Sequence, residues 1–331
     1  MKKKLIAMLL SAAMCLSLAA CGQKADTPDT TDPAEPSGDA ATYTVGICQL
    51  VQHEALDAAT QGFIDALNEA LPGQVKIEEK NASGDSNSCA TIVNGFVSEG
   101  VDLIMANATA ALQAAASATS DIPVLGTSIT AYGVALDIDD FSGTVGGNVS
   151  GTSDLADLSK QADMITEWFP ETQKVGLLFC SGEPNSRYQI EEVAKNLSAK
   201  GIETKEFAFT DTNDVSSVTQ KAADSCDVVY IPTDNTAASC TEAINNVAEP
   251  AGVPIVAGEE GICKGCGIAT LSIDYYELGK TTGAMAAKIL TGEANVSEMP
   301  IEYYQNPVKK YDVARCEALG ITVPADYVAI G

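Results

Sequence analysis

Positive charge and histidine are scarce in this sequence. Lysine and arginine together number 19 against 45 aspartates and glutamates, and the formal net charge is −26. Because proteins bind nucleic acid largely through clustered lysine and arginine, this balance argues against a nucleic-acid partner. His53 is the only histidine. A multi-histidine metal site and catalysis that needs two imidazoles are therefore excluded.

Sequence motifs of common enzyme classes are also missing. The chain contains no GxSxG, GxxxxGK[ST] or HExxH pattern, and its glycine-rich stretch 143–147 lacks the GxGxxG spacing of dinucleotide-binding turns. We therefore expect a protein without catalytic residues, metal or cofactor, and not an enzyme.

Long hydrophobic runs are lacking after the N-terminal segment, so no later stretch is expected to span a bilayer. The N-terminal segment 1–20 has three lysines followed by an apolar run, which is the pattern of a secretory signal peptide. An uncleaved membrane span is the alternative. The tetrapeptide that ends at Cys21 resembles the lipobox of bacterial lipoproteins, which implies lipidation of Cys21 and a lipid anchor on the outer side of the cell membrane. Segment 21–41 is acidic and poor in large apolar residues, so we expect a disordered linker.

The rest of the chain alternates short β-branched runs with amphipathic stretches of helical length. This pattern predicts an α/β fold with two Rossmann-like lobes, in which helices flank parallel sheets and a ligand cleft lies between the lobes. We expect an N-terminal lobe at 42–150 (plus about 274–298) and a C-terminal lobe at 151–273 (plus about 299–331). Strands are predicted at 42–48, 75–79, 101–106, 122–125, 174–180, 202–207, 228–231 and 253–256. Helices are predicted at 55–71, 87–99, 110–118, 155–168, 185–199, 215–223, 236–248, 277–290 and 312–319.

Eight cysteines follow Cys21. Several lie in or beside apolar strand-like runs, so we expect mostly free, buried thiols, although export would also permit disulfides. Cys263 and Cys266 flank a Lys-Gly pair without a second CxxC motif. A local disulfide or two free thiols in a glycine-rich turn fits this spacing better than a metal site.

Polar residues follow most of the predicted strands. Ligands of open parallel sheets bind beyond the carboxyl ends of the strands, so these residues are candidate ligand contacts. Helix capping is the alternative explanation for each of them, because Ser, Thr, Asp and Asn are common N-caps. Neutral hydrogen-bonding groups and carboxylates at this edge suit a small polar or zwitterionic ligand. The candidates are Gln49, His53, Asn107, Thr109, Thr127, Ser128, Thr130, Ser181, Gly182, Asn185, Ser186, Thr233, Asp234, Asn235, Gly258, Glu259 and Glu260.

Several stretches together resemble one protein family. They include Val45 to Gln49, Gly151 to Asp154, Gly182 to Ser186, Pro232 to Thr236, Ala257 to Glu259 and Ile273 to Gly279. In order and spacing they resemble the ABC transporter substrate-binding lipoproteins of the tryptophan/tyrosine-binding type. The resemblance implies a periplasmic-binding-protein fold of type I, with three segments crossing between two lobes. It also implies a small-molecule ligand and partners in an ABC permease and its ATPase subunit.

The resemblance assigns ligand-binding roles to individual residues. They are Gln49, His53, Thr109, Thr127, Asn185, Ser186, Asp234, Asn235, Glu259 and Asp274. For an amino-acid ligand, the hypothesis is that Asp274 or Asp234 faces the ammonium group and that Ser186 and Thr127 face the carboxylate. Family members usually have Glu-His-Pro where this chain has Gln-His-Glu around His53, so an aromatic amino acid is only the leading ligand. A nucleoside, a peptide-like solute, or a role as lipid-anchored sensor are the alternatives.

Overall fold

The computed structural model describes residues 43–330. The predicted signal peptide, the lipidation site Cys21 and the acidic linker lie outside the described residues. The described part begins with alternating strands and helices. In chain order these are β1 (Tyr43–Gln49), α1 (Glu54–Ala70), β2 (Val75–Asn81), α2 (Ser86–Glu99), β3 (Leu103–Asn107), α3 (Thr109–Ala118), β4 (Val124–Ile129), α4 (Tyr132–Ala135) and β5 (Val149–Ser153).

A second series of elements follows β5. It consists of α5 (Leu158–Trp168), β6 (Lys174–Cys180), α6 (Pro184–Ala199), β7 (Glu203–Phe209), α7 (Val215–Ala223), β8 (Val228–Ile231), α8 (Asn235–Ser239), α9 (Thr241–Ala251), β9 (Ile255–Ala257), α10 (Glu260–Cys266) and β10 (Ala269–Ser272). The last elements are α11 (Tyr275–Leu290), a 3-10 turn (Val296–Glu298), β11 (Glu302–Tyr303), β12 (Val308–Tyr311), α12 (Val313–Leu319) and β13 (Val328–Ala329).

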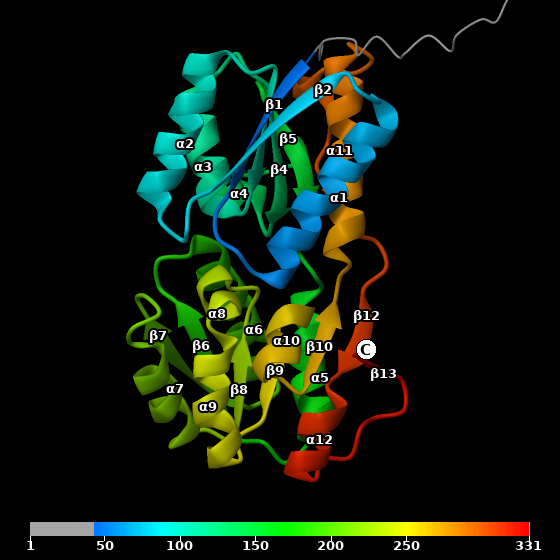
Figure 1. The fold of residues 1–331 in the computed structure, drawn as a ribbon. Coiled ribbons are helices and arrows are strands. Elements are labelled where there is room, and N and C mark those ends of the chain that lie inside the picture. Colours follow the sequence, from blue (N-terminus) through cyan, green and yellow to red (C-terminus); the bar gives the residue numbers. More distant parts are fainter. Residues whose placement is uncertain (1–42, 331) are drawn as a thin grey trace, which may run out of the picture. The chain divides into compact units, whose positions relative to one another are not determined.

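The strands form two sheets with helices on their faces (Figure 1). The strand order is β11-β5-β4-β3-β1-β2 in the first sheet and β13-β12-β10-β9-β8-β6-β7 in the second. Neighbouring strands run parallel, except that β12 is antiparallel to β10. The predicted α/β fold with two sheets of mainly parallel strands is therefore confirmed. We call the first sheet with α1–α4 and α11 the first lobe, and the second sheet with α5–α10 and α12 the second lobe.

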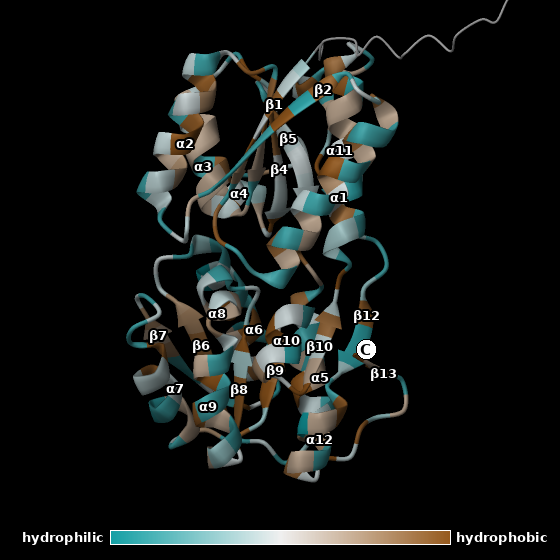
Figure 2. Cartoon of the chain, in the orientation of Figure 1, coloured by the Kyte–Doolittle hydropathy of each residue, from teal (hydrophilic) through white to brown (hydrophobic). Residues whose placement is uncertain are grey.

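The hydrophobic pattern explains these elements. The interior strands β3 and β6 are buried almost throughout, which is typical of strands covered on both faces. In α1 the residues Leu56, Phe63 and Leu67 recur at helical spacing and are fully or almost fully buried. Figure 2 shows hydrophilic and hydrophobic residues alternating along the outer helices. Trp168 packs edge-on against Tyr327 in the core of the second lobe, with ring centroids 5.0 Å apart.

Helix α11 returns to the first lobe after the second sheet is complete. It lies beside α1 (Figure 1), where Tyr276 donates to Asp65 across the two helices at 2.9 Å. Two glycines of α11 allow the close approach. A Cβ at Gly279 would overlap the carbonyl oxygen of Ala59, and one at Gly283 would lie 2.6 Å from the carbonyl oxygen of Phe63. Consequently three segments connect the lobes, at 154–157, 273–274 and 304–307.

Three sequence expectations differ from the structure. The stretch 261–267, expected as a turn, is helix α10, and Gly265 serves close packing because a Cβ there would collide with Thr241. The predicted helix at 236–248 is two helices, α8 and α9, separated at Cys240, where φ is −135°. Strand β5 (Val149–Ser153) of the first sheet was not among the predicted strands. The predicted domain boundaries stay a prediction.

All eight cysteines in the described residues are free thiols, and seven of them are buried. Within residues 43–330 no group of three or more His, Cys, Asp or Glu side chains is arranged to hold a metal ion. No helix in the same range has the length and apolar character to cross a membrane.

Candidate functional site

The predicted ligand-contact residues lie at the carboxyl ends of strands in both lobes. Most of them are buried, whereas His53 is half-buried and Asp274 is exposed. The buried ones are Gln49, Thr109, Thr127 and Ser128 in the first lobe and Asn185, Ser186, Asp234, Asn235 and Glu259 in the second. So many buried polar side chains at two sheet edges need partners, because an unpaired buried polar group is costly.

Two contacts join the lobes at this level. Nε2 of His53 in the first lobe lies 3.3 Å from Oδ1 of Asn235 in the second. Burial lowers the pKa of His53, so the neutral imidazole, with its N–H donated to Asn235, fits this contact. The ammonium of Lys264 on α10 pairs with the carboxylate of Glu54 at the start of α1 at 2.9 Å. The predicted residues after β1 and β8 are thus brought together.

Glu183 is the centre of the polar network in the second lobe. Its carboxylate accepts hydrogen bonds from the backbone N–H groups of Asn235 and Thr236 at 3.0 and 2.8 Å. It also accepts from the side chains of Asn235, Thr236 and Asn185, at 2.8, 2.7 and 3.1 Å. Glu183 fixes the residues after β6 and β8 relative to one another. It was missing from the predicted site, although it directly precedes Pro184 at a helix start, which is an N-terminal signal.

Three predicted carboxylates act as helix N-caps. Asp234 accepts from the backbone N–H groups of Cys180 and Ala237 at 2.7 and 2.8 Å. Glu259 accepts from those of Gly261, at 2.7 Å, and Ile262. Burial raises the pKa of both, with neighbouring Glu183 adding to the effect on Asp234, and that of Glu259 reaches about 7. Asp274 caps α11 by accepting from Glu277 N–H at 3.1 Å. The capping alternative therefore describes what these three side chains do in this structure.

The first-lobe residues divide into paired and unpaired groups. Gln49 is fully engaged, since it donates to Asp57 at 2.6 Å and accepts from Thr60 at 2.6 Å. Oγ1 of Thr127 lies 3.2 Å from Oγ1 of Thr152. Oγ of Ser128, by contrast, is buried and has no hydrogen-bond partner among the described residues. Ser128 also has a φ of +56°, a strained conformation for serine.

Asp154, directly after β5, is a second unpaired group that the sequence expectations did not single out. Its Oδ2 accepts from the hydroxyl of Tyr275 at 3.0 Å, whereas Oδ1 is buried and has no hydrogen-bond partner among the described residues. Burial raises the pKa of Asp154 to about 6. Its backbone N–H donates to the carbonyl oxygen of Ile129 at 3.2 Å, which places Asp154 next to the strand end that carries Ser128. No local sequence signal marks this pairing, because Asp154 and Tyr275 are 121 residues apart.

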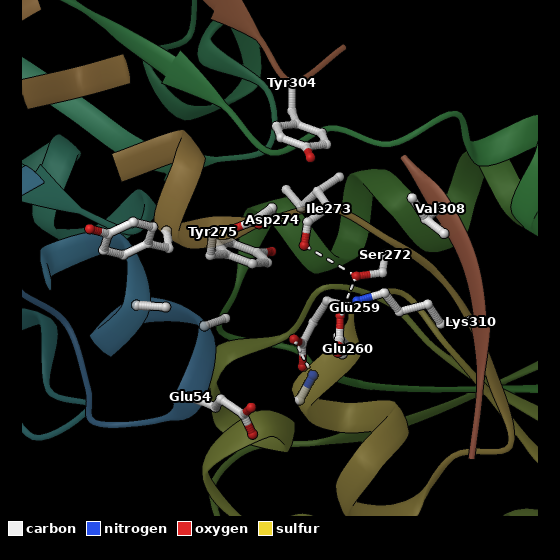
Figure 3. A pocket seen from close by; sticks show the side chains of 14 residues that line it. Glu54, Glu259, Glu260, Ser272, Ile273, Asp274, Tyr275, Tyr304, Val308 and Lys310 are labelled. Atoms are coloured by element: carbon white, nitrogen blue, oxygen red, sulfur yellow. Dashed lines mark hydrogen bonds and ion pairs between the residues drawn. The ribbon is translucent and has the colours of Figure 1, made fainter. Parts of the chain in front are cut away.

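A cavity of about 310 Å³ is lined by two of the predicted ligand contacts, Glu259 and Asp274, and by Tyr275. Its wall comes from the starts of α1, α10 and α11 and from the segment around β12 (Figure 3). Tyr275, Tyr276 and Tyr304 provide aromatic surface, and Glu54, Glu259, Glu260, Asp274 and Lys310 provide charge. The Lys310 ammonium is already paired with Glu260 at 2.6 Å. This size and mixed lining are suitable for a small organic molecule.

Comparison with known proteins identifies the family. The profile of the family "ABC transporter substrate binding protein" matches residues 44–328. The chain belongs to this family. It is therefore an extracytoplasmic substrate-binding protein of an ABC transporter, and the family is one of binding proteins. The three crossing segments and the two-lobed fold agree with the type I periplasmic-binding-protein fold that the resemblance implied.

Individual relatives are similar over most of their length. A tyrosine-binding protein of Clostridioides difficile (strain R20291) is 31% identical over 90% of this chain and 87% of its own. The structure of an ABC domain in complex with L-Trp from Streptococcus pneumonia is 31% identical, with a TM-score of 0.82 over 88% of this chain and 100% of that one.

A third relative is described as ligand-free and open. It is a substrate binding protein with adhesive properties from Clostridium difficile, 32% identical over 87% of this chain and 100% of its own, with a TM-score of 0.66. The higher score for the L-Trp complex means that this structure is more similar to that complex than to the open one.

Proposed function

We propose that this protein captures an amino acid with an aromatic side chain between its lobes and delivers it to the permease of an ABC importer, without catalysing a reaction. The buried polar side chains at the strand ends of both lobes, together with the His53–Asn235 contact between the lobes, carry this proposal. Burying these side chains costs free energy of folding, because Ser128 and Asp154 each keep an oxygen without a partner among the described residues. A ligand enclosed between the lobes would supply those partners.

The ligand class follows from the lining of the site and from the relatives. Hydrogen-bonding groups and carboxylates suit the polar end of an amino acid, and the tyrosines of the cavity suit an aromatic side chain. Relatives described as tyrosine-binding and as bound to L-Trp support the same class. The proposed ligand-contact residues are Gln49, His53, Thr109, Thr127, Ser128, Asn185, Ser186, Asp234, Asn235, Glu259 and Asp274.

The proposal includes attachment to the cell membrane through lipid on Cys21. The sequence around Cys21 supports it, as does membership of a family that works with membrane permeases. A lipid anchor would keep the protein beside its permease after the signal peptide is removed.

A thermal-shift screen of the twenty amino acids tests the proposed ligand class. The purified protein is first unfolded and refolded so that it carries no ligand from the expression host. A ligand at 100 times its dissociation constant adds about 2.7 kcal/mol to the free energy of unfolding, which raises the melting temperature of a protein of this size by several degrees.

We expect a shift with tyrosine, tryptophan or phenylalanine. No shift with any amino acid would contradict the proposed ligand class, and the same screen with nucleosides and short peptides would then test the alternatives.

A further inference from the structure

Asp154 differs from the other buried carboxylates of the site in the pairing of its oxygens. Both oxygens of Asp234 and of Glu259 accept from backbone N–H groups. Asp154 is only 4% exposed, yet Oδ1 has no hydrogen-bond partner among the described residues. No lysine or arginine within residues 43–330 forms an ion pair with it. A buried carboxylate without a cationic partner is costly.

The end of the neighbouring strand β4 contains a second buried polar atom without a partner within residues 43–330. Ser128 precedes Ile129, whose carbonyl oxygen accepts from Asp154 N–H, and the Oγ of Ser128 is buried without a partner among the described residues. The positive φ of Ser128 means that the fold also holds this residue in a strained conformation. Strain and unpaired polar atoms at adjacent strand ends are typical of a site that a ligand completes.

The chemistry of the two groups selects the ligand group. An ionised carboxylate is only an acceptor, and a serine hydroxyl also accepts. A neutral N–H or O–H donor would leave the charge of Asp154 uncompensated. A protonated primary amine supplies three N–H donors and a positive charge. It therefore satisfies both requirements.

We propose that Asp154 binds the α-ammonium group of the amino-acid ligand and that Tyr275 is a positioning residue that fixes the Asp154 carboxylate. This inference rests on the proposed function and adds the recognition of the amino group. Tyr275 is the first residue of α11 and also lines the cavity. Ligand binding at Asp154 would thus involve one connecting segment, 154–157, and the helix start that directly follows another, 273–274.

Proton release accompanies such binding. The titratable groups near Asp154 are Tyr275 on α11 and Tyr132 on α4, and Glu259 is a further charged group near Tyr275. Burial raises the pKa of both tyrosines, so they are neutral at physiological pH. Without ligand the pKa of Asp154 is about 6. An ammonium beside it lowers that pKa, so binding near pH 6 releases protons.

The test compares each amino acid with its analogue that lacks the amino group, by isothermal titration calorimetry. The probes are L-tyrosine with 3-(4-hydroxyphenyl)propionate and L-tryptophan with 3-(indol-3-yl)propionate. In Asp154→Asn we expect amino-acid binding to weaken about 100-fold while binding of the analogue changes less than about 3-fold. Tyr275→Phe should weaken amino-acid binding about 10-fold. The matched control is Asp65→Asn, which alters an exposed aspartate bonded to Tyr276 on the same helix pair.

Several outcomes would overturn the proposal. One is amino-acid binding by Asp154→Asn within about 3-fold of wild type, and another is equal weakening of both probes, which a purely structural role predicts. If Asp154→Asn does not fold, proton release by the wild-type protein tests the proposal instead. Titrations at pH 6 in two buffers of different ionisation enthalpy must show protons released with the amino acid and none with the analogue. Failure of wild type to bind any amino acid overturns the proposed function as well, so the two failures are distinguishable.

Discussion

Burial raises the pKa of Asp154 to about 6 and that of Glu259 to about 7. A carboxyl group with a raised pKa binds its proton more tightly in the folded than in the unfolded protein. Its contribution to stability is therefore fully present below pH 4 and is lost as the pH rises through the raised value. Each of the two groups lowers the free energy of unfolding at pH 8 by something on the order of 3 kcal/mol.

We expect the free energy of unfolding of the ligand-free protein to rise as the pH falls from 8 to 5. Below pH 4 it should fall again, because hydrogen bonds hold the pKa of surface aspartates such as Asp157 and Asp227 below the usual value. Urea unfolding at a series of pH values measures this. Glu259→Gln should reduce the rise, whereas Asp65→Asn should leave it unchanged. A stability that stays constant or falls between pH 8 and pH 5 would show that these carboxyls are not buried as described.

The sequence predicted some residues of the candidate site and missed others. Thr127, Ser128 and Asn235 became candidates because they follow predicted strands, and the carboxyl ends of parallel strands meet at one edge of a sheet. It did not select Asp154 or Glu183. Their importance depends on partners that approach from distant segments, such as Tyr275 for Asp154 and Asn235 for Glu183. The ligand-binding roles themselves stay a prediction.

Elements with a strong apolar pattern were predictable from the sequence. The predicted strand at 174–180, helix at 215–223 and strand at 228–231 have the bounds of β6, α7 and β8. Strand β5 was missed because it is rich in small polar residues and has no apolar pattern. Its polar side chains are satisfied by tertiary contacts instead, as when Ser150 donates to the carbonyl oxygen of Met299 at 3.0 Å.

The contact between α1 and α11 yields a prediction about two glycines. Gly279→Ala should lower the free energy of unfolding by about 1 to 3 kcal/mol, because its Cβ would overlap the carbonyl oxygen of Ala59. Gly95→Ala in α2 is the matched control, since nothing lies within 4 Å of the added Cβ. It should raise that free energy by about 0.5 to 1 kcal/mol through helix propensity alone. Chemical denaturation of both variants measures the difference, and a Gly279→Ala variant as stable as wild type would contradict the close packing.

At the scale of the whole molecule, one of the ion pairs between described residues joins the two lobes, that of Lys264 with Glu54. Both side chains are about half exposed, so the pair contributes less than about 1 kcal/mol. Because the pair forms only when the lobes approach each other, it stabilises the closed arrangement of the lobes around the ligand.

Lys264→Met should therefore weaken ligand binding by a factor of about 2 to 5, mainly through faster dissociation, and the effect should shrink at high salt. Stopped-flow fluorescence with the amino acid found in the screen measures the dissociation rate. Lys200→Met is the control, because Lys200 pairs with Asp163 inside the second lobe. Equal dissociation rates in the two variants would exclude a role of the Lys264 pair in closure.

The return of α11 and β11 to the first lobe affects the order in which the protein folds. When a ribosome has made the chain as far as β10, the second sheet lacks only β12 and β13, whereas α1 still lacks the helix that covers Phe63 and Leu67. The lobe that is synthesised first therefore completes its core only after residue 303 has been added. Contacts of such large sequence separation slow folding. Growing chains would consequently expose the apolar face of the first lobe for most of their synthesis, and chaperones that bind such surfaces would have a long interval in which to act.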